Sequence, residues 1–584
     1  MFSTILNNLD FFRKIIINLF FLIFVLTIII GLFIFPLLNN GKVDAKGRIL
    51  TLSVNEISDK NSSYFSPQNN LNIFEIVEAL ELASRDESVE VVFIDLSYLS
   101  ISSVSAYEIG KSINLLKEKE KKVIAYGDFL TQSQYLLASY ANEIIVNPFG
   151  MVYLEGFKKY QIYLKDFLEE NKINVNTYVA GDFKSATEIF SNSKMSDEDK
   201  NQSNIFLNDL WANWLSEINL NRKSLKIDIN LFINNFNQID SSLSAAEKAK
   251  KYGLVDKILN RVELRNYFLT LGNINQNVED GDPSTLSLDT YYKAKKQTSS
   301  SKDKIVLLNA YGEIVDGTFQ ENQIASDFFA KKIRKIANDP DVKGLLLRIN
   351  SPGGSGFASE VIRQEILNLK KSGIPIIVSI SDVAASGGYW ISANADEIWA
   401  SPLSVTGSIG VFAVLPSFED ALTDYGINFD GISTTNFNPS IISNPDENVK
   451  LFIQNYVDSA YLDFIELVSN GRNLNKKLVK EISNGKIWTG KQALENGLID
   501  NLGTQFEAIE RLKNIVGDKN IKVEYLNFEQ SFFDFLETNL LSLKSFYRLF
   551  FNDTKITNFV FDEFFLLDKK IIDLRLDCLN CFVK

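Results

Sequence analysis

Two long segments of the sequence repeat each other at a constant offset, and this repeat limits the possible folds more than any other feature. Residues Asp128 to Pro148 match residues Asp382 to Pro402 at an offset of 254 positions. A second pair, Tyr252 to Asp256 and Asn496 to Asp500, follows at an offset of 244. A period this long indicates a duplicated domain, because solenoid repeats are only about 20–50 residues long.

Each half of the sequence has a pattern of strands alternating with helices. In the second half, apolar strand-like runs cover Ile305–Asn309, Gly344–Ile349 and Ile374–Ile380. Apolar residues at helical spacing between the last two runs predict a helix over Ser355–Lys371. In the first half, Val91–Leu96 repeats the second of these runs. Strand–helix–strand order predicts parallel sheets, so we expect two tandem α/β domains.

The repeat and the local composition set the expected domain limits. Residues 276–302 contain a Gly-Asp-Pro sequence and a run of serines, which predict a linker between the two halves. The residues after about 517 are rich in Phe, helical in pattern and without a counterpart in the first half. The expected units are a head (1–14), a transmembrane anchor (15–38), a first domain (39–275), the linker (276–302), a second domain (303–516) and a helical extension (517–584).

The anchor is predicted from one apolar run, Ile15 to Leu38. At 1.5 Å of rise per residue, these 24 residues can cross a bilayer core of about 30 Å. A cleaved secretory signal is the alternative, but the apolar region of a signal is typically only about 7–15 residues long. Arg13 and Lys14 precede the run and favour a cytoplasmic N-terminus. The body is then expected on the periplasmic, outer face of the inner membrane as a single-pass protein.

The composition excludes several classes of protein. The sequence has no histidine, which removes Ser-His-Asp triads, Cys-His dyads and every metal site that uses histidine. A net charge of −13 argues against nucleic-acid binding, because phosphates would be repelled. The two cysteines, Cys578 and Cys581, could form a disulfide or bind metal in a partner complex, but two ligands are too few for a metal site of their own. We therefore expect no metal and no cofactor.

Two glycine-rich turns follow strands in the second half and could together form a pocket. The Gly353-Gly354 pair leaves backbone N–H groups open to an oxyanion or a phosphate, although an ordinary strand-to-helix turn is the better explanation of this pair taken alone. Ser386 stands at the second turn, between an apolar strand and a helix, with the Gly387 N–H beside it. A helix-capping serine would have the same pattern. Two such turns after successive parallel strands nevertheless favour a pocket, with Ser386 placed as a nucleophile.

A serine nucleophile needs a base, and in a chain without histidine a lysine can serve if burial keeps its amine neutral. The repeat indicates Lys184 for this role. Lys184 aligns with Asn438, and Ser386 aligns with Gln132, both at the offset of 254. A lone lysine is more often a surface residue, and unequal drift could have removed both counterparts. Drift alone does not explain why each half lacks the residue that the other half keeps.

At these residues the chain resembles the long form of signal peptide peptidase A, or protease IV, within the Ser-Lys peptidases that have a ClpP/crotonase-like fold. The resemblance covers nearly the whole chain, and the segment around Ser386 is its most specific part. The matching motifs are the N-terminal anchor, Gly181–Glu188, Ser351–Ser355, Ala384–Ser392 and Thr406–Gly410. The resemblance implies tandem ClpP/crotonase-like domains after one transmembrane helix, and a membrane-anchored serine endopeptidase that degrades cleaved signal peptides and similar hydrophobic peptides. It also implies a homo-oligomer, a tetramer in this family, whose partners are peptides and the membrane.

The expected mechanism follows from these residues. Ser386 attacks a peptide carbonyl, Lys184 accepts its proton, and backbone N–H groups of Gly387, Gly353 and Gly354 hold the oxyanion. Because Lys184 and Ser386 lie in different halves, we expect one centre per chain and no hydrolysis by the isolated second half.

Two other classes are left open by the sequence. A crotonase-type acyl-CoA hydratase or isomerase also uses glycine-rich oxyanion turns, but it would need carboxylates at the pocket and has no reason for an anchor. A non-catalytic membrane scaffold is the third possibility.

Overall fold

The computed structural model describes residues 44–57, 59, 71–181, 183–272, 281–296, 301–318, 322–435, 437, 439–526 and 575–577, together with Leu19 and Ile23. The predicted anchor apart from Leu19 and Ile23, Asn438 and both cysteines lie outside these residues. Among the helices of the described residues, none has the length and the apolar character needed to cross a membrane.

The first domain is built on a six-stranded sheet in the order β8-β6-β5-β3-β1-β9, and every neighbouring pair in it is parallel. Helices α3 (Ile73–Arg85), α4 (Ser103–Glu118) and α5 (Gln132–Ser139) connect its successive strands. The strands are β1 (Ile49–Ser53), β3 (Val91–Asp95), β5 (Lys122–Gly127), β6 (Glu143–Val146), β8 (Lys257–Ile258) and β9 (Thr285–Ser287).

The second domain repeats this sheet strand for strand, in the order β20-β16-β15-β13-β10-β21, again with parallel pairs. β15 also carries two further strands, β17 (Val405–Gly407) and then β19 (Ile487–Thr489). The six repeated strands are β10 (Lys304–Tyr311), β13 (Val342–Ser351), β15 (Ile376–Ala385), β16 (Glu397–Ala400), β20 (Asn501–Leu502) and β21 (Lys522–Leu526). The two matching sheets confirm tandem α/β domains with parallel sheets.

The edge strands of both sheets differ from the prediction. β9 and α12 (Leu288–Lys295) lie within the expected linker, where Tyr291 and Tyr292 are buried against the first domain. β21, at the start of the expected helical extension, is the counterpart of β9 and pairs with β10. Both strands are short, so their two-residue periodicity is too brief to stand out in the sequence. The first domain therefore extends into the expected linker, and the second extends beyond residue 517.

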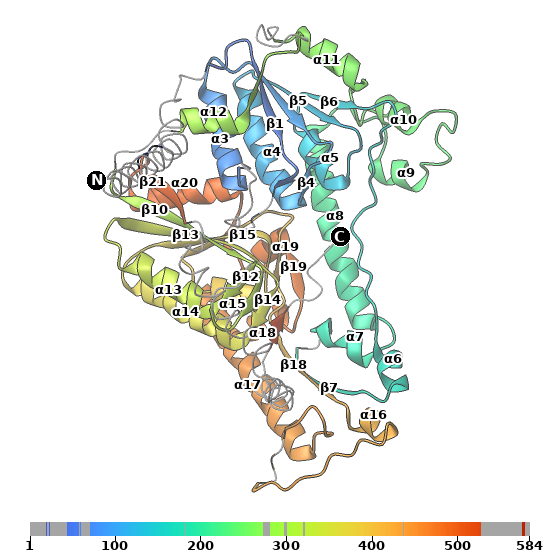
Figure 1. Ribbon diagram of the computed structural model, residues 1–584, viewed down its shortest axis with the longest axis vertical. Coiled ribbons are helices and arrows are strands. Elements are labelled where there is room, and N and C mark those ends of the chain that lie inside the picture. Colours follow the sequence, from blue (N-terminus) through green and yellow to red (C-terminus); the bar gives the residue numbers. More distant parts are fainter. Residues whose placement is uncertain are drawn as a thin grey trace, which may run out of the picture.

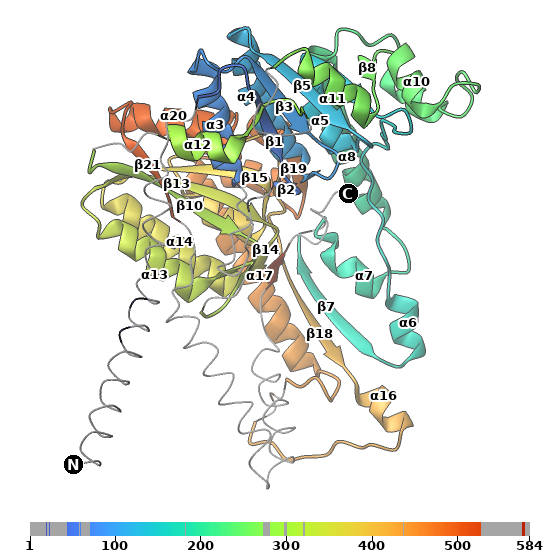
Figure 2. The same cartoon turned by 45° about the horizontal axis from the view of Figure 1, so that its top comes forward.

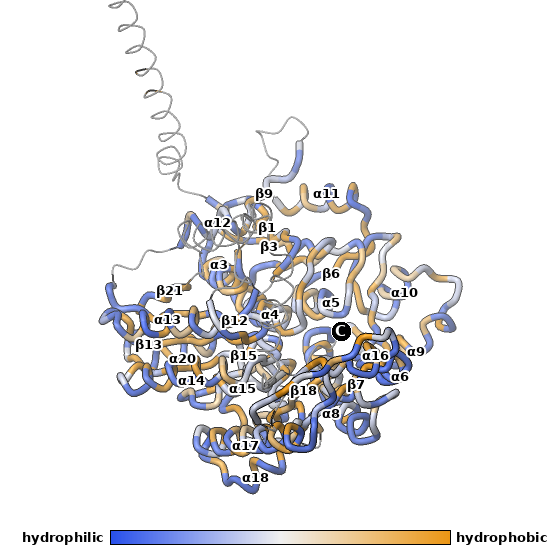
Figure 3. The backbone as a smooth tube through the Cα atoms, turned by 60° about the horizontal axis from the view of Figure 1, so that its bottom comes forward, coloured by the Kyte–Doolittle hydropathy of each residue, from blue (hydrophilic) through white to orange (hydrophobic). Residues whose placement is uncertain are grey.

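A third sheet joins the two halves in the order β12-β11-β14-β22-β18-β7. β7 comes from the first half and pairs antiparallel with β18 of the second half, from Asn174 opposite Ser417 to Ala180 opposite Val411. The two strands lie side by side in Figure 2, and β18 is apolar along most of its length (Figure 3). Its strands are β7 (Asn174–Ala180), β11 (Glu313–Val315), β12 (Gln323–Ala325), β14 (Gly353–Ser355), β18 (Val411–Ser417) and β22 (Arg575–Asp577).

The helices cover the sheets and extend the molecule. In Figure 1 the first domain lies above the second, and the long helix α8 (Asp197–Asn221) runs from the first domain down one side of the second. α17 (Glu447–Arg472) takes the corresponding place after the second sheet. The other helices include α6 (Lys165–Glu170), α7 (Glu188–Ser191), α10 (Ala245–Lys251), α11 (Arg261–Leu269), α13 (Ser326–Ala337), α14 (Gly356–Lys371), α15 (Gly387–Ser392), α16 (Glu419–Asp424), α19 (Gly490–Glu495) and α20 (Gln505–Val516).

A buried ion cluster connects the two domains. Arg348 on β13 donates from both terminal nitrogens to the Glu108 carboxylate on α4, at 2.8 and 3.0 Å. Its Nε lies 3.3 Å from Asp59 Oδ1, and the exposed fractions of the Arg348 and Asp59 side chains are 1% and 3%. Burial raises the pKa of Glu108, and the neighbouring guanidinium opposes that rise. Charges so deeply buried need their partners, so this cluster fixes the position of one domain against the other.

Candidate active site

Ser386 lies at a sharp turn between β15 and α15. Its φ of 54° and ψ of −115° place it in a region that L-residues rarely adopt. Two hydrogen bonds hold this backbone, because the Ser386 N–H donates to Gly407 O at 2.9 Å and the Trp390 N–H donates to Ser386 O at 2.8 Å. The residue is fully buried. A strained turn that is held by hydrogen bonds in this way fixes the direction of the Ser386 hydroxyl group.

Lys184 reaches this hydroxyl from the other half of the same chain. It follows β7, its side chain is buried, and its Nζ donates to Ser386 Oγ at 2.9 Å. A loop of the second domain holds the backbone next to Lys184, because the Phe183 N–H donates to Asn484 O at 2.7 Å. A Cβ at Gly485 in that loop would collide with the Lys184 backbone. The structure thus brings together the two residues that the repeat had singled out.

Ser408 is a third member of the cluster, and the sequence assigned it no role. Lys184 Nζ donates to Ser408 Oγ at 3.0 Å and to Ser408 O at 3.2 Å. Ser408 follows β17 with a φ of 51°, so its backbone is strained as well. The Phe412 ring centroid lies 5.9 Å from the same nitrogen. Ser408 and Ser386 together fix the direction of the Lys184 amine.

Replacing Ser408 by alanine should lower kcat for peptide hydrolysis by about five- to tenfold. One orienting hydrogen bond is worth about 1 kcal/mol, and the backbone carbonyl would still hold the amine. Steady-state kinetics on a fluorogenic peptide measure the change. A loss as large as that of Ser386→Ala, or none at all, would contradict an orienting role.

Three glycines, Gly353, Gly354 and Gly387, lie against one another next to Ser386. A Cβ on Gly387 would lie 3.2 Å from the Gly354 nitrogen and 3.3 Å from the Gly353 Cα. The φ values of Gly353 and Gly354 are 114° and 149°, which only glycine adopts readily. The predicted turn is in fact the short strand β14, and helix α14 begins after it at Gly356. The Gly353 N–H donates to Ser351 Oγ at 3.2 Å.

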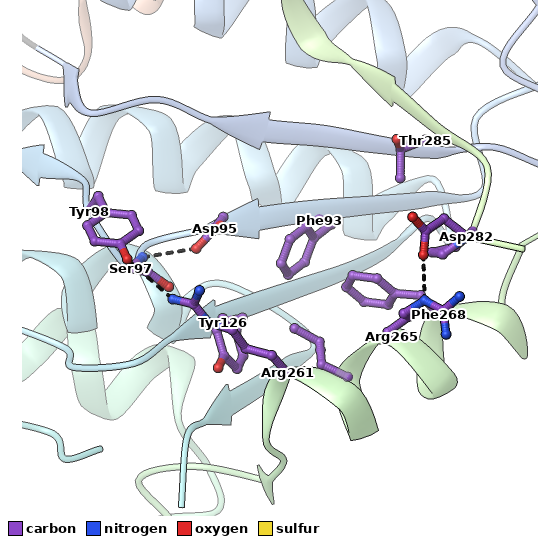
Figure 4. A pocket seen from close by; sticks show the side chains of 12 residues that line it. Phe93, Asp95, Ser97, Tyr98, Tyr126, Arg261, Arg265, Phe268, Asp282 and Thr285 are labelled. Carbon is purple, nitrogen blue, oxygen red and sulfur yellow. Dashed lines mark hydrogen bonds and ion pairs between the residues drawn. The ribbon is translucent and has the colours of Figure 1, made fainter. Parts of the chain in front are cut away.

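A separate cavity of about 410 Å³ lies in the first domain beside α11 (Figure 4). Its floor is aromatic, with the Phe93 and Phe268 ring centroids 4.6 Å apart. Both of its arginines are already paired, Arg261 with Asp128 and Arg265 with Asp282. None of the predicted site residues lines this cavity. Within the described residues there is also no group of His, Cys, Asp or Glu side chains that could hold a metal ion.

The fold and this cluster define a class of protein. A buried serine hydroxyl at hydrogen-bond distance from a buried lysine amine, beside glycine backbone, is the arrangement of a Ser-Lys hydrolase. A family model for peptidase family S49 matches residues 115–272 and 368–519, one segment in each half. The chain belongs to peptidase family S49, and it is a serine protease.

The chain is similar to curated proteins that are named as proteases or peptidases. The chain is 35% identical to "Protease 4" of Haemophilus influenzae over 459 residues, 77% of this chain and 74% of that protein. It is 31% identical to "Protease 4" of Salmonella typhi over 545 residues, 90% of this chain and 87% of that protein. The "Putative signal peptide peptidase SppA" of Enterococcus faecium is 38% identical over 224 residues, 37% of this chain and 65% of that protein. The predicted family is confirmed, and the hydratase and scaffold alternatives are set aside.

Proposed function

We propose that Ser386 is the nucleophile and Lys184 the general base of a single catalytic centre in each chain. The observation that carries this proposal is the 2.9 Å distance between Lys184 Nζ and Ser386 Oγ. Ser386 Oγ attacks the substrate carbonyl carbon while its proton passes to the neutral Lys184 amine. The same proton then goes to the leaving amine, which departs and leaves an acyl-enzyme on Ser386. Water, deprotonated in turn by Lys184, attacks the acyl carbon, and the proton then passes from Lys184 to Ser386 Oγ as the acid is released.

The oxyanion of each tetrahedral intermediate is assigned to backbone N–H groups at the glycine wall. Gly387 follows the nucleophile directly and Gly354 lies against it, which supports these two donors. Gly353 would have to release Ser351 Oγ before it could take part. One such donor is worth about 2.7–4 kcal/mol in acyl transfer, so this wall supports much of the rate.

A serine-reactive fluorophosphonate tests the assignment directly. The full-length protein should be labelled at Ser386, and Lys184→Ala should slow labelling because the hydroxyl then lacks its base. The labelling rate should also rise with pH, since only a neutral amine can accept the serine proton. Mass spectrometry of the labelled peptide identifies the site. Labelling at another serine, or equal labelling of Ser386→Ala, would overturn the assignment.

The substrates proposed are cleaved signal peptides and similar hydrophobic peptides, and the protein is proposed to be a membrane-anchored homo-oligomer. The printed name of the Enterococcus relative supports the substrate class. The apolar run over residues 15–38 supports the anchor. The ClpP/crotonase-like form of both domains and the tetramer are predictions from the family resemblance.

The proposed orientation of the chain in the membrane can be tested on spheroplasts. Protease added to spheroplasts should digest the body of the chain and leave only a small N-terminal piece, because Arg13 and Lys14 favour a cytoplasmic head. Immunoblotting for both ends of the chain follows the digestion. Protection of the body until the cells are lysed would reverse the proposed orientation.

A further inference from the structure

A buried ion pair is linked to the residue that follows the proposed base. Lys159 Nζ donates to Asp199 Oδ1 and Oδ2 at 2.7 and 2.8 Å, and the exposed fractions of the two side chains are 10% and 5%. The buried Ser185 hydroxyl, one residue after Lys184, donates to the same Oδ1 at 2.9 Å. The proposed mechanism gives no role to Lys159, Asp199 or Ser185.

The carboxylate of this pair lies at the start of helix α8. Asp199 is the third residue of α8, and its N–H donates to Ser196 Oγ at 3.1 Å. The helix dipole favours an acidic residue there, but such a residue is usually exposed, as Asp197 is at 88%. α17, the corresponding helix of the second half, has Val449 at the same capped position. The half that provides the lysine thus has a buried carboxylate where the other half has an apolar side chain.

One turn further along, α8 contacts the second domain. Gln202 Nε2 donates to Ile487 O on β19 at 2.7 Å. Ile487 lies opposite Gly407 in the pairing of β19 with β17, and the Ser386 N–H donates to Gly407 O. The contacts therefore form a closed path from the segment with Lys184, through α8, to the backbone that holds the proposed nucleophile.

We propose that the Lys159–Asp199 pair, acting through Ser185, positions the proposed base against the nucleophile without bringing it net charge. The inference rests on the proposed function of Ser386 and Lys184. A carboxylate is a stronger acceptor than a neutral group, so it holds the Ser185 hydroxyl and the backbone beside the base. The Lys159 ammonium balances this carboxylate, which alone would favour the protonated form of the buried amine. The three side chains are positioning residues, because they act through Lys184.

Other titratable side chains also face this region. Burial and the nearby carboxylates raise the pKa of Tyr163 to about 12, so this phenol stays neutral at ordinary pH. Glu188 on α7 accepts hydrogen bonds from the Ser196 Oγ and N–H at 2.6 and 3.1 Å. Lys486 Nζ lies 4.9 Å from the Phe183 ring centroid. The variants described next leave all of these groups in place, so a difference in pH dependence between the variants reports on the pair.

The pH dependence of fluorophosphonate labelling tests the charge balance. In the full-length wild type the labelling rate of Ser386 should rise with pH, and the midpoint of the rise reports on the base. In Lys159→Met the unpaired carboxylate favours the ammonium form of Lys184, so the midpoint should move about 0.5 pH unit or more upward. In Asp199→Asn the unpaired Lys159 ammonium should move the midpoint downward. The double variant Lys159→Met/Asp199→Asn is neutral again, and its midpoint should return close to that of wild type.

Ser185→Ala tests the link itself, because it removes the hydroxyl without changing any charge. Peptide hydrolysis by this full-length variant should have a kcat about five- to tenfold lower than wild type, at unchanged KM and unchanged pH midpoint. A buried pair elsewhere in the first domain is the control, since Arg222 donates to Asp256 Oδ1 at 3.0 Å. Asp256→Asn should lower the thermal stability and leave both kcat and the midpoint as in wild type.

Midpoints that move in the same direction in Lys159→Met and Asp199→Asn, or that stay unchanged in both, would overturn the proposal. An unchanged kcat in Ser185→Ala would also overturn it, and this variant decides the question if the charge variants do not fold. Failure of the proposed function gives a different result, namely wild-type hydrolysis no faster than that of Ser386→Ala.

Discussion

Ser386→Ala and Lys184→Ala should each lower kcat/KM for peptide hydrolysis by at least about 10⁴-fold, while the fold is retained. In the proposed mechanism both side chains act on one proton, so removing either one should stop the same step. The double variant should then cost little more than either single one, as expected for groups that act as a unit. Progress curves at high enzyme concentration give the residual rates.

The first half of the chain provides a matched control for this prediction. Gln132, the counterpart of Ser386, accepts a hydrogen bond from the Gly156 N–H at 2.9 Å. Gln132→Ala should leave kcat/KM within about twofold of wild type, because it removes only one hydrogen bond, which is worth about 1 kcal/mol of stability. Additive losses in the Ser386 and Lys184 variants would mean that the two residues serve separate steps.

Arg348→Met should destabilise the protein by about 3–5 kcal/mol, because it leaves Glu108 and Asp59 buried without their cation. The shift in the denaturant midpoint, followed by tryptophan fluorescence, measures this loss. Arg334→Met is the control, since Arg334 makes a 3.5 Å pair with Glu365 at 54% side-chain exposure. An exposed pair is worth less than about 1 kcal/mol.

A second variant distinguishes the effect of unpaired buried charge from the effect of lost side-chain packing. Adding Glu108→Leu to Arg348→Met removes one of the stranded carboxylates and should recover part of the lost stability. Equal destabilisation of the control and Arg348→Met would mean that the cluster contributes no more than a surface pair.

Much of the fold and the main site residues follow from the sequence. The runs at 305–309, 344–349 and 374–380 are long and apolar, so the central part of each strand can be recognised from the sequence. Lys184 and Ser386 were found because a duplicated chain carries an internal comparison, in which Gln132 and Asn438 mark what each half has lost. The structure brings the pair to 2.9 Å.

The features missed by sequence share a physical cause. The seating of Lys184 on the loop at Asn484 and its contact with Ser408 join positions hundreds of residues apart through backbone atoms. Backbone groups are the same for every residue, so they leave little trace in a single sequence. β9, β21 and β22 are strands of three to five residues, and such short runs become strands only when a partner edge is present.

The pairing of β7 with β18 also bears on how such a chain can arise. If the two halves were separate molecules, they would have to meet before any site was complete, and activity would fall steeply on dilution. Joined by a covalent link, the lysine arm is always present in a one-to-one ratio with its serine. With that arm reaching across, a second lysine in the second half and a second serine in the first half would have no partner, and the chain carries Asn438 and Gln132 at those positions.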